Sequence, residues 1–227
     1  MSNRFPPPAG ACRNRGFTLL ELSVVLVIIG LIVGAVTIGK DVQRNAAYQR
    51  IASEFVQGWA IGYDTFWTNN GIVIADNPSN PTGMVNAATA TPLCTTNLRA
   101  AMQAAGVAMP AGRAEGSETR AVYLDSHGVP QELAICFENV NWSIPGATPG
   151  SYVVRKRNVM TLTGLTPSMA KLLDSHFDGR VDARFGKLRE QSAAANTGTA
   201  SIAWSQNEPA TDESQSPTMN AYLLMNE

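Results

Sequence analysis

Residues 15–36 read RGFTLLELSVVLVIIGLIVGAV and contain a single carboxylate, that of Glu21. The apolar run from Phe17 to Ile38 has 22 residues, and only three of its other side chains are polar. As a helix it would be about 33 Å long, enough to cross the hydrocarbon core of a bilayer. A carboxylate at the centre of such a helix costs roughly 2.5–3.5 kcal/mol, and less near an end. Glu21 therefore requires a partner or a function.

The composition of the whole chain conceals two unlike parts. The 227 residues are 44% hydrophobic and 15% charged, with a net charge of −1. The first 16 residues carry three arginines and no acid, so residues 17–227 hold 14 basic and 18 acidic side chains, a net charge of −4. A mildly acidic chain gives no global sign of nucleic-acid binding, and we expect no nucleic-acid partner.

Two ordinary explanations of the apolar run remain open at this point. A secretory signal peptide has a shorter apolar region, although Ala35 to Lys40 could serve as a weak cleavage site. A plain transmembrane anchor has the right length but gains nothing from Glu21.

The segment Gly16-Phe17-Thr18-Leu19-Leu20-Glu21, with its basic leader and apolar run, resembles the type IV prepilin processing signature. This signature is shared by type IV pilins and by the pseudopilins of type II secretion systems. The resemblance implies that a prepilin peptidase cuts between Gly16 and Phe17 and that the new Phe17 amine is methylated. It also implies that Glu21 of one subunit pairs with the Phe17 ammonium of a neighbour, an ion pair that is strong in low dielectric.

The pattern after the run predicts that the helix continues into an exported head. Ile51, Phe55, Trp59, Gly62 and Phe66 recur at three- or four-residue steps, and the turn signal Asn69-Asn70-Gly71 ends the segment. We therefore expect an α+β, pilin-like fold with a long N-terminal helix on a small antiparallel sheet. The predicted parts are a leader (1–16), a membrane and filament-core helix (17–38), an amphipathic continuation (39–70) and a globular head (71–227).

Within the head, strands are predicted at 121–124, 131–137, 152–160, 202–205 and 221–225, and helices at 95–109 and 166–177. The second helix has Thr166 as its cap and Pro167 at its first position. If the head is exported, Cys94 and Cys136 are expected to form a disulfide, with two separate buried thiols as the alternative. Their mid-chain positions differ from the C-terminal disulfide of many major pilins.

The head offers few candidates for chemistry. Asp-Ser-His occurs at 125–127 and 174–176, but adjacent residues do not supply a catalytic triad by themselves, so we expect no enzyme activity and no cofactor. Asp174, Asp178 and Asp182 are weak candidates for calcium ligands, with surface ion pairs as the alternative. The triplet Arg155-Lys156-Arg157 could meet phosphates, but only two of the three share a face of a strand.

These observations predict a structural subunit of a type IV pilus or pilus-like filament. Its expected partners are prepilin peptidase, other pilin subunits and the inner membrane. Before assembly it would be a single-pass protein of the bacterial inner membrane with a cytoplasmic N-terminus, and afterwards part of a periplasmic or cell-surface filament. A type II secretion pseudopilin, a minor pilin and a membrane-anchored domain that binds a ligand without polymerising are the alternatives.

Overall fold

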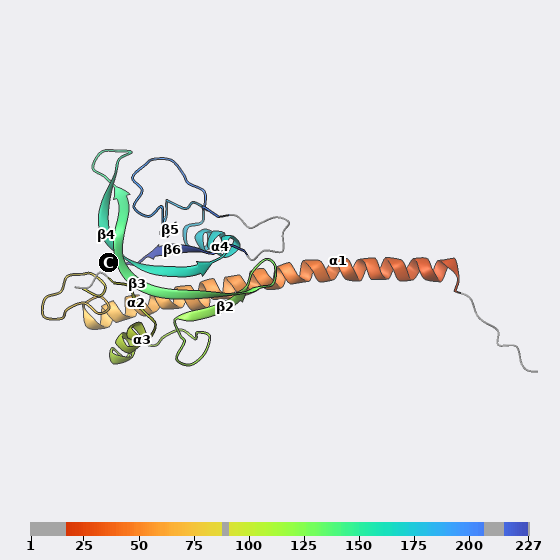
Figure 1. The fold of residues 1–227 in the computed structure, drawn as a ribbon, viewed down its shortest axis with the longest axis horizontal. Helices are drawn as coiled ribbons and strands as arrows, with labels where there is room; N and C mark the ends of the chain where they lie inside the picture. The colour runs from red at the N-terminus through yellow and green to blue at the C-terminus, as the bar shows by residue number, and fades with distance from the viewer. Residues whose placement is uncertain (1–16, 88–90, 207–215, 227) are drawn as a thin grey trace, which may run out of the picture. The chain divides into compact units, whose positions relative to one another are not determined.

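The computed structural model describes residues 17–87, 91–206 and 216–226, with Thr37 and Ile38 described by their backbone alone. A long helical segment comes first and an antiparallel sheet follows, which confirms the predicted α+β class (Figure 1). The chain divides into a unit that ends at Gln43 and a compact unit that begins at Arg44. The second unit, here called the head unit, contains all the strands found in the described residues.

The helical segment has three consecutive parts. These are α1 (Leu19–Arg50), the π-helical turn η1 (Ile51–Val56) and α2 (Gln57–Asn70). As the turn signal predicted, the helix ends at Asn70, because Gly71 adopts a left-handed conformation (φ 69°) and its N–H donates to the Trp67 carbonyl at 2.8 Å. The π turn was not predicted; in it the Ser53 hydroxyl donates to the Gln49 carbonyl at 2.9 Å.

The remaining elements form one sheet with two short helices. They are β1 (Leu93–Cys94), α3 (Thr95–Ala104), β2 (Arg120–Leu124), β3 (Pro130–Pro145), β4 (Tyr152–Leu165), α4 (Pro167–Asp178), β5 (Leu188–Glu190) and β6 (Met219–Leu224). The strand order is β1-β3-β4-β6-β5, with β2 also paired to β3, and all pairs are antiparallel. The strand β6 therefore lies inside the sheet although it follows all the others in the chain.

The main core lies between the helix and the sheet. The side chains of Phe55, Trp59 and Phe66, which the periodicity placed on one helix face, are buried. The ring of Phe137 on β3 lies 5.2 Å from that of Tyr63 and 6.3 Å from that of Trp59, between ring centroids. The amphipathic prediction for this half of the helix is thus confirmed.

A second, smaller core lies along the β3–β4 hairpin. It contains Trp142, Val159, Ala194 and Tyr222. The guanidinium of Arg189 lies 4.1 Å from the Trp142 ring centroid and donates to the carbonyl groups of Ser143 and Ala194. Burial, together with the charge of Arg184, lowers the pKa of Arg189 to about 10.

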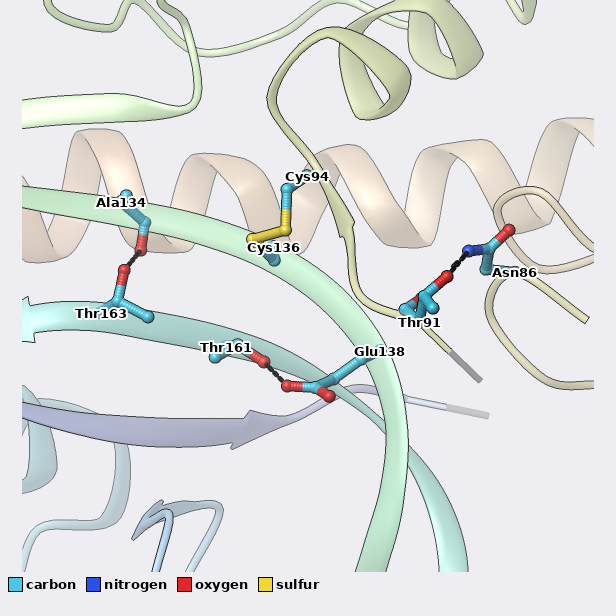
Figure 2. Close-up of a disulfide and its surroundings, with 8 residues drawn as sticks. All are labelled: Asn86, Thr91, Cys94, Ala134, Cys136, Glu138, Thr161 and Thr163. Carbon is cyan, nitrogen blue, oxygen red and sulfur yellow. Dashed lines mark hydrogen bonds between the residues drawn. A yellow bond between two sulfur atoms is a disulfide. The ribbon is translucent and has the colours of Figure 1, made fainter. Parts of the chain in front are cut away.

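A disulfide joins Cys94 to Cys136, the predicted pair (Figure 2). The two residues are directly opposite each other where β1 pairs with β3. The bond therefore fixes the chain that leads into α3 onto the central part of the sheet.

Several predicted boundaries were wrong. The hairpin strands β3 and β4 are longer than predicted, because each pairs with the other from Ala134 and Thr163 out to Pro145 and Tyr152. The expected strand at 202–205 is absent. The Ile202 N–H donates to the Asp182 carboxylate and the Ile202 carbonyl accepts from the Ala183 N–H, so this main chain joins the loop after α4 and not the sheet. The short strands β1 and β5 had no pattern long enough to predict.

Candidate assembly helix

The start of α1 is a reciprocal cap made by Thr18 and Glu21. The Thr18 N–H and hydroxyl donate to Glu21 Oε2 at 2.8 and 3.0 Å, and the Glu21 N–H donates to the Thr18 hydroxyl at 3.2 Å. This is the capping box of the pattern T-x-x-E. Sequence reasoning had missed Thr18, although the three-residue spacing to Glu21 signals the cap.

The cap uses only one oxygen of the Glu21 carboxylate. Both Thr18 donors go to Oε2, and among the described residues no hydrogen bond to Oε1 is present. A carboxylate oxygen can accept from an ammonium group while its twin caps a helix. Glu21 can therefore cap its own helix and pair with a cation from outside the chain.

The helix after this cap is apolar on every side. Phe17 is 90% exposed, and each of the large apolar side chains from Leu19 to Val36 is about half exposed or more. A helix that is apolar all round requires a lipid or protein environment. Within the described residues, one helical segment, Leu19–Asn70, contains an 18-residue stretch apolar enough to cross a membrane, with a mean hydropathy of 2.8.

Two glycines leave gaps in this apolar surface. A Cβ added to Gly30 or Gly34 would meet no heavy atom within 4 Å. No contact within the described chain therefore requires glycine at these positions. The G-x-x-x-G spacing lets a second helix approach closely, as small residues do in membrane helix pairs.

Residues 12–37 match the family model of the prokaryotic N-terminal methylation motif. This chain carries a prepilin signal. The match covers the leader end, Glu21 and most of the apolar helix, and it supports a processed subunit of the pilin or pseudopilin kind. No curated protein and no solved structure matches the chain.

The predicted cleavage point between Gly16 and Phe17 lies at the border of the described residues. Phe17 is the first described residue, whereas Gly16 and the rest of the leader (1–16) lie outside them. The assignment of Gly16 and Phe17 to processing and of Glu21 to assembly therefore stays a prediction that rests on the motif.

The aspartates suggested as calcium ligands in the head unit each accept hydrogen bonds from backbone N–H groups. Asp178 accepts from Lys187 and Leu188 at 2.8 and 2.9 Å, and Asp182 accepts from Arg184 at 2.9 Å. Asp174 accepts from the Asp182 N–H and from the Trp204 indole at 2.7 and 2.9 Å.

No group of three acidic, histidine or cysteine side chains in the described ranges is arranged to hold a metal ion. The geometry therefore gives no support to the calcium hypothesis and assigns these aspartates to loop closure.

The first Asp-Ser-His sequence forms a turn between β2 and β3. The buried Asp125 carboxylate accepts from the N–H groups of His127 and Val129 at 2.9 and 2.8 Å and from the Gln131 amide, so it organises the turn and does not orient the imidazole. The His127 Nδ1 atom lies 3.3 Å from the hydroxyls of Ser126 and Ser216. A nucleophile and base are thus adjacent, but the orienting carboxylate of a triad is used elsewhere.

The basic triplet Arg155-Lys156-Arg157 lies on β4, as predicted. Arg155 pairs with Trp142 of β3 and Lys156 pairs with Asn141, so consecutive basic side chains point to opposite faces of the hairpin. No single face collects the three charges that a phosphate-binding patch would use.

Proposed function

We propose that this chain is a structural, non-enzymatic subunit of a type IV pilus or pilus-like filament. The single observation that carries the proposal is the match of residues 12–37 to the N-terminal methylation motif. The exposed apolar helix supports it, because this surface suits storage in the inner membrane and later burial among neighbouring helices. In this proposal the leader is removed by prepilin peptidase, and the N-terminus faces the cytoplasm before assembly.

The Glu21 carboxylate has two roles in this proposal. Through Oε2 it caps its own helix with Thr18, and through Oε1 it pairs with the Phe17 ammonium of a neighbouring subunit. Charges buried in lipid or protein are costly unless paired, so the pair would set the axial register of neighbouring helices.

The direct test is mass spectrometry of the chain purified from cells that contain the prepilin peptidase. The expected product begins at N-methylated Phe17. An intact leader in such cells, or a cut after the apolar run, would overturn the proposal and favour the signal-peptide or plain-anchor alternatives.

A second test separates the two roles of Glu21. The Glu21→Gln variant keeps the cap, since glutamine also serves in a capping box, but it loses the charge. We expect normal cleavage and loss of filaments by electron microscopy. The matched control is Thr18→Ser, which retains a capping hydroxyl and should assemble; filaments of normal yield from Glu21→Gln would show that the ion pair is not needed.

A further inference from the structure

The first part of β4 has one open edge. The strand pairs with β3 from Tyr152 to Thr163, but β6 covers its other side only between Val159 and Leu165. Figure 1 shows the β3–β4 hairpin continuing past the end of β6. The segment Tyr152–Arg157, here called the open edge, therefore has a sheet partner on one side alone.

The hydrogen bonds of neighbouring residues fix the direction of the main chain along the open edge. Ser143, opposite Val154, donates its N–H to the Ala194 carbonyl at 2.9 Å and accepts from Arg189, so its main-chain groups point away from β4. In an antiparallel pair such a residue faces one whose own N–H and C=O also point outward. Val154 therefore directs its N–H and C=O to the open edge.

The same alternation applies to Lys156. Two residues further on, the Asn158 carbonyl accepts from the Met225 N–H at 3.0 Å, which confirms the outward direction of the even-numbered positions. Among the described residues, the main-chain groups of Val154 and Lys156 have no hydrogen-bond partner. The open edge thus presents a strand's row of unpaired donors and acceptors.

The side chains of this edge are apolar and cationic. Val153 and Val154 are 39% and 40% exposed, and Arg155 and Lys156 are exposed. From Asn139 to Asn158 the hairpin holds three cationic side chains and no carboxylate. If two copies paired antiparallel with Lys156 opposite Lys156, cations would face cations along the ladder, which is unfavourable.

We propose that the open edge of β4 binds an extended acidic peptide segment of a partner protein as an added β-strand. The outward main-chain groups of Val154 and Lys156 supply the hydrogen bonds, and the exposed valines supply apolar contact. The exposed side chains of Arg155 and Lys156 select carboxylates on the added strand and disfavour a second copy of the same edge. The proposal does not depend on filament assembly.

The test uses the full chain in detergent micelles and a fluorescent peptide that alternates valine and glutamate. Fluorescence anisotropy should report binding that weakens with salt, and a peptide that alternates valine and lysine should not bind. Absence of binding by the valine–glutamate peptide would overturn the proposal. The basic triplet would then be explained as charges on an edge strand that prevent edge-to-edge aggregation.

The decisive variant is Val154→Pro, which removes an outward N–H without breaking the β3–β4 ladder. It should weaken peptide binding about 2- to 10-fold, the equivalent of one hydrogen bond. Its matched control, Val154→Thr, keeps the N–H and should bind as the parent chain does, and circular dichroism establishes that both variants are folded.

Equal peptide binding by Val154→Pro and Val154→Thr would refute strand addition. Duplex DNA can be tested as a competitor of the peptide. If it competes, and if the Val154→Pro variant binds it as tightly as the parent chain does, the edge is a phosphate-binding surface instead.

Discussion

Replacing Asp174 by asparagine should stabilise the head above neutral pH. The side chain of Asp174 is fully buried on α4, and its Oδ1 atom has no hydrogen-bond partner. Burial raises the pKa of this carboxyl from 3.8 to about 7, against the opposing effect of the donors Trp204 and Asp182, and the adjacent Asp178 carboxylate raises it further.

The size of the effect follows from the difference between the folded and unfolded states. An ordinary aspartate ionises near 3.8, whereas Asp174 in the folded head ionises near 7. Between these values the folded state binds one more proton than the unfolded state, so the free energy of unfolding falls as the pH rises. About three pH units at 1.36 kcal/mol each correspond to roughly 4 kcal/mol.

Asparagine has the same shape and does not titrate. Its oxygen can accept from Trp204 and Asp182, and its amide nitrogen can donate toward Asp178 where Oδ1 now lies. We expect Asp174→Asn to unfold at higher urea concentration than the parent chain at about pH 8, and the gain to vanish near pH 4.

The assay is urea denaturation followed by circular dichroism across this pH range, with the chain in mild detergent. The control is Asp182→Asn. Burial tends to raise the pKa of Asp182, but hydrogen bonds from Ser201, Arg184, Phe185 and Ile202 lower it below the ordinary value. The stabilisation that the ionised Asp182 carboxylate contributes is therefore present at neutral pH and lost in acid. A parent chain whose stability does not fall between about pH 4 and pH 7 relative to Asp174→Asn would refute the reasoning.

Four further outcomes are expected. Reduction of Cys94–Cys136, which closes a separation of 42 residues, should cost about 4 kcal/mol by the chain-entropy estimate; an unchanged melting temperature in reductant would contradict this. Gly164→Ala should strongly destabilise the head, because φ is +82° and the new Cβ would lie 2.2 Å from the Glu132 carbonyl oxygen. The control Gly116→Ala has a similar φ of +85° but open space around the new Cβ, and it should cost only about 1 kcal/mol. Equal melting temperatures for the two variants would refute the clash. Thr166→Ala should cost about 1 kcal/mol by removing the α4 cap, measured by thermal melting against Thr163→Ala, and a loss no larger than that control's would argue against the cap. Trp59→Ala should cost about 3–5 kcal/mol because its fully buried ring packs on Phe137, and a denaturation midpoint within error of the parent chain would show that this core does not bear on stability.

The helix could be predicted in detail because its signals are local. The apolar run, the spacing from Phe55 to Phe66 and the turn at Gly71 each depend on neighbours in sequence. The cap at Thr166 was predicted for the same reason. The cap at Thr18 is equally local, because Thr18 and Glu21 are three residues apart, but it was not predicted.

The sheet was harder to predict because its pairing is long-range. The outer parts of β3 and β4 are strands because each pairs with the other, and neither alternates strongly enough to show this alone. The role of Arg189 was not visible, since nothing in its own neighbourhood indicates that Ser143, Trp142 and Ala194 surround it. The spacing of Asp174 and Asp182 suggested metal ligands, but only the fold shows that each carboxylate accepts a backbone N–H group.

The interior position of β6 sets the order in which the head can be completed. This strand pairs with β4 on one side and β5 on the other, and its Ala221 and Leu223 are almost wholly buried. Before residues 219–224 have been synthesised, the β3–β4 hairpin can form, but the position beside it in the sheet stays vacant. A protease or chaperone that acts at this stage thus meets an incomplete sheet, and a deletion that begins at Met219 removes one of its interior strands.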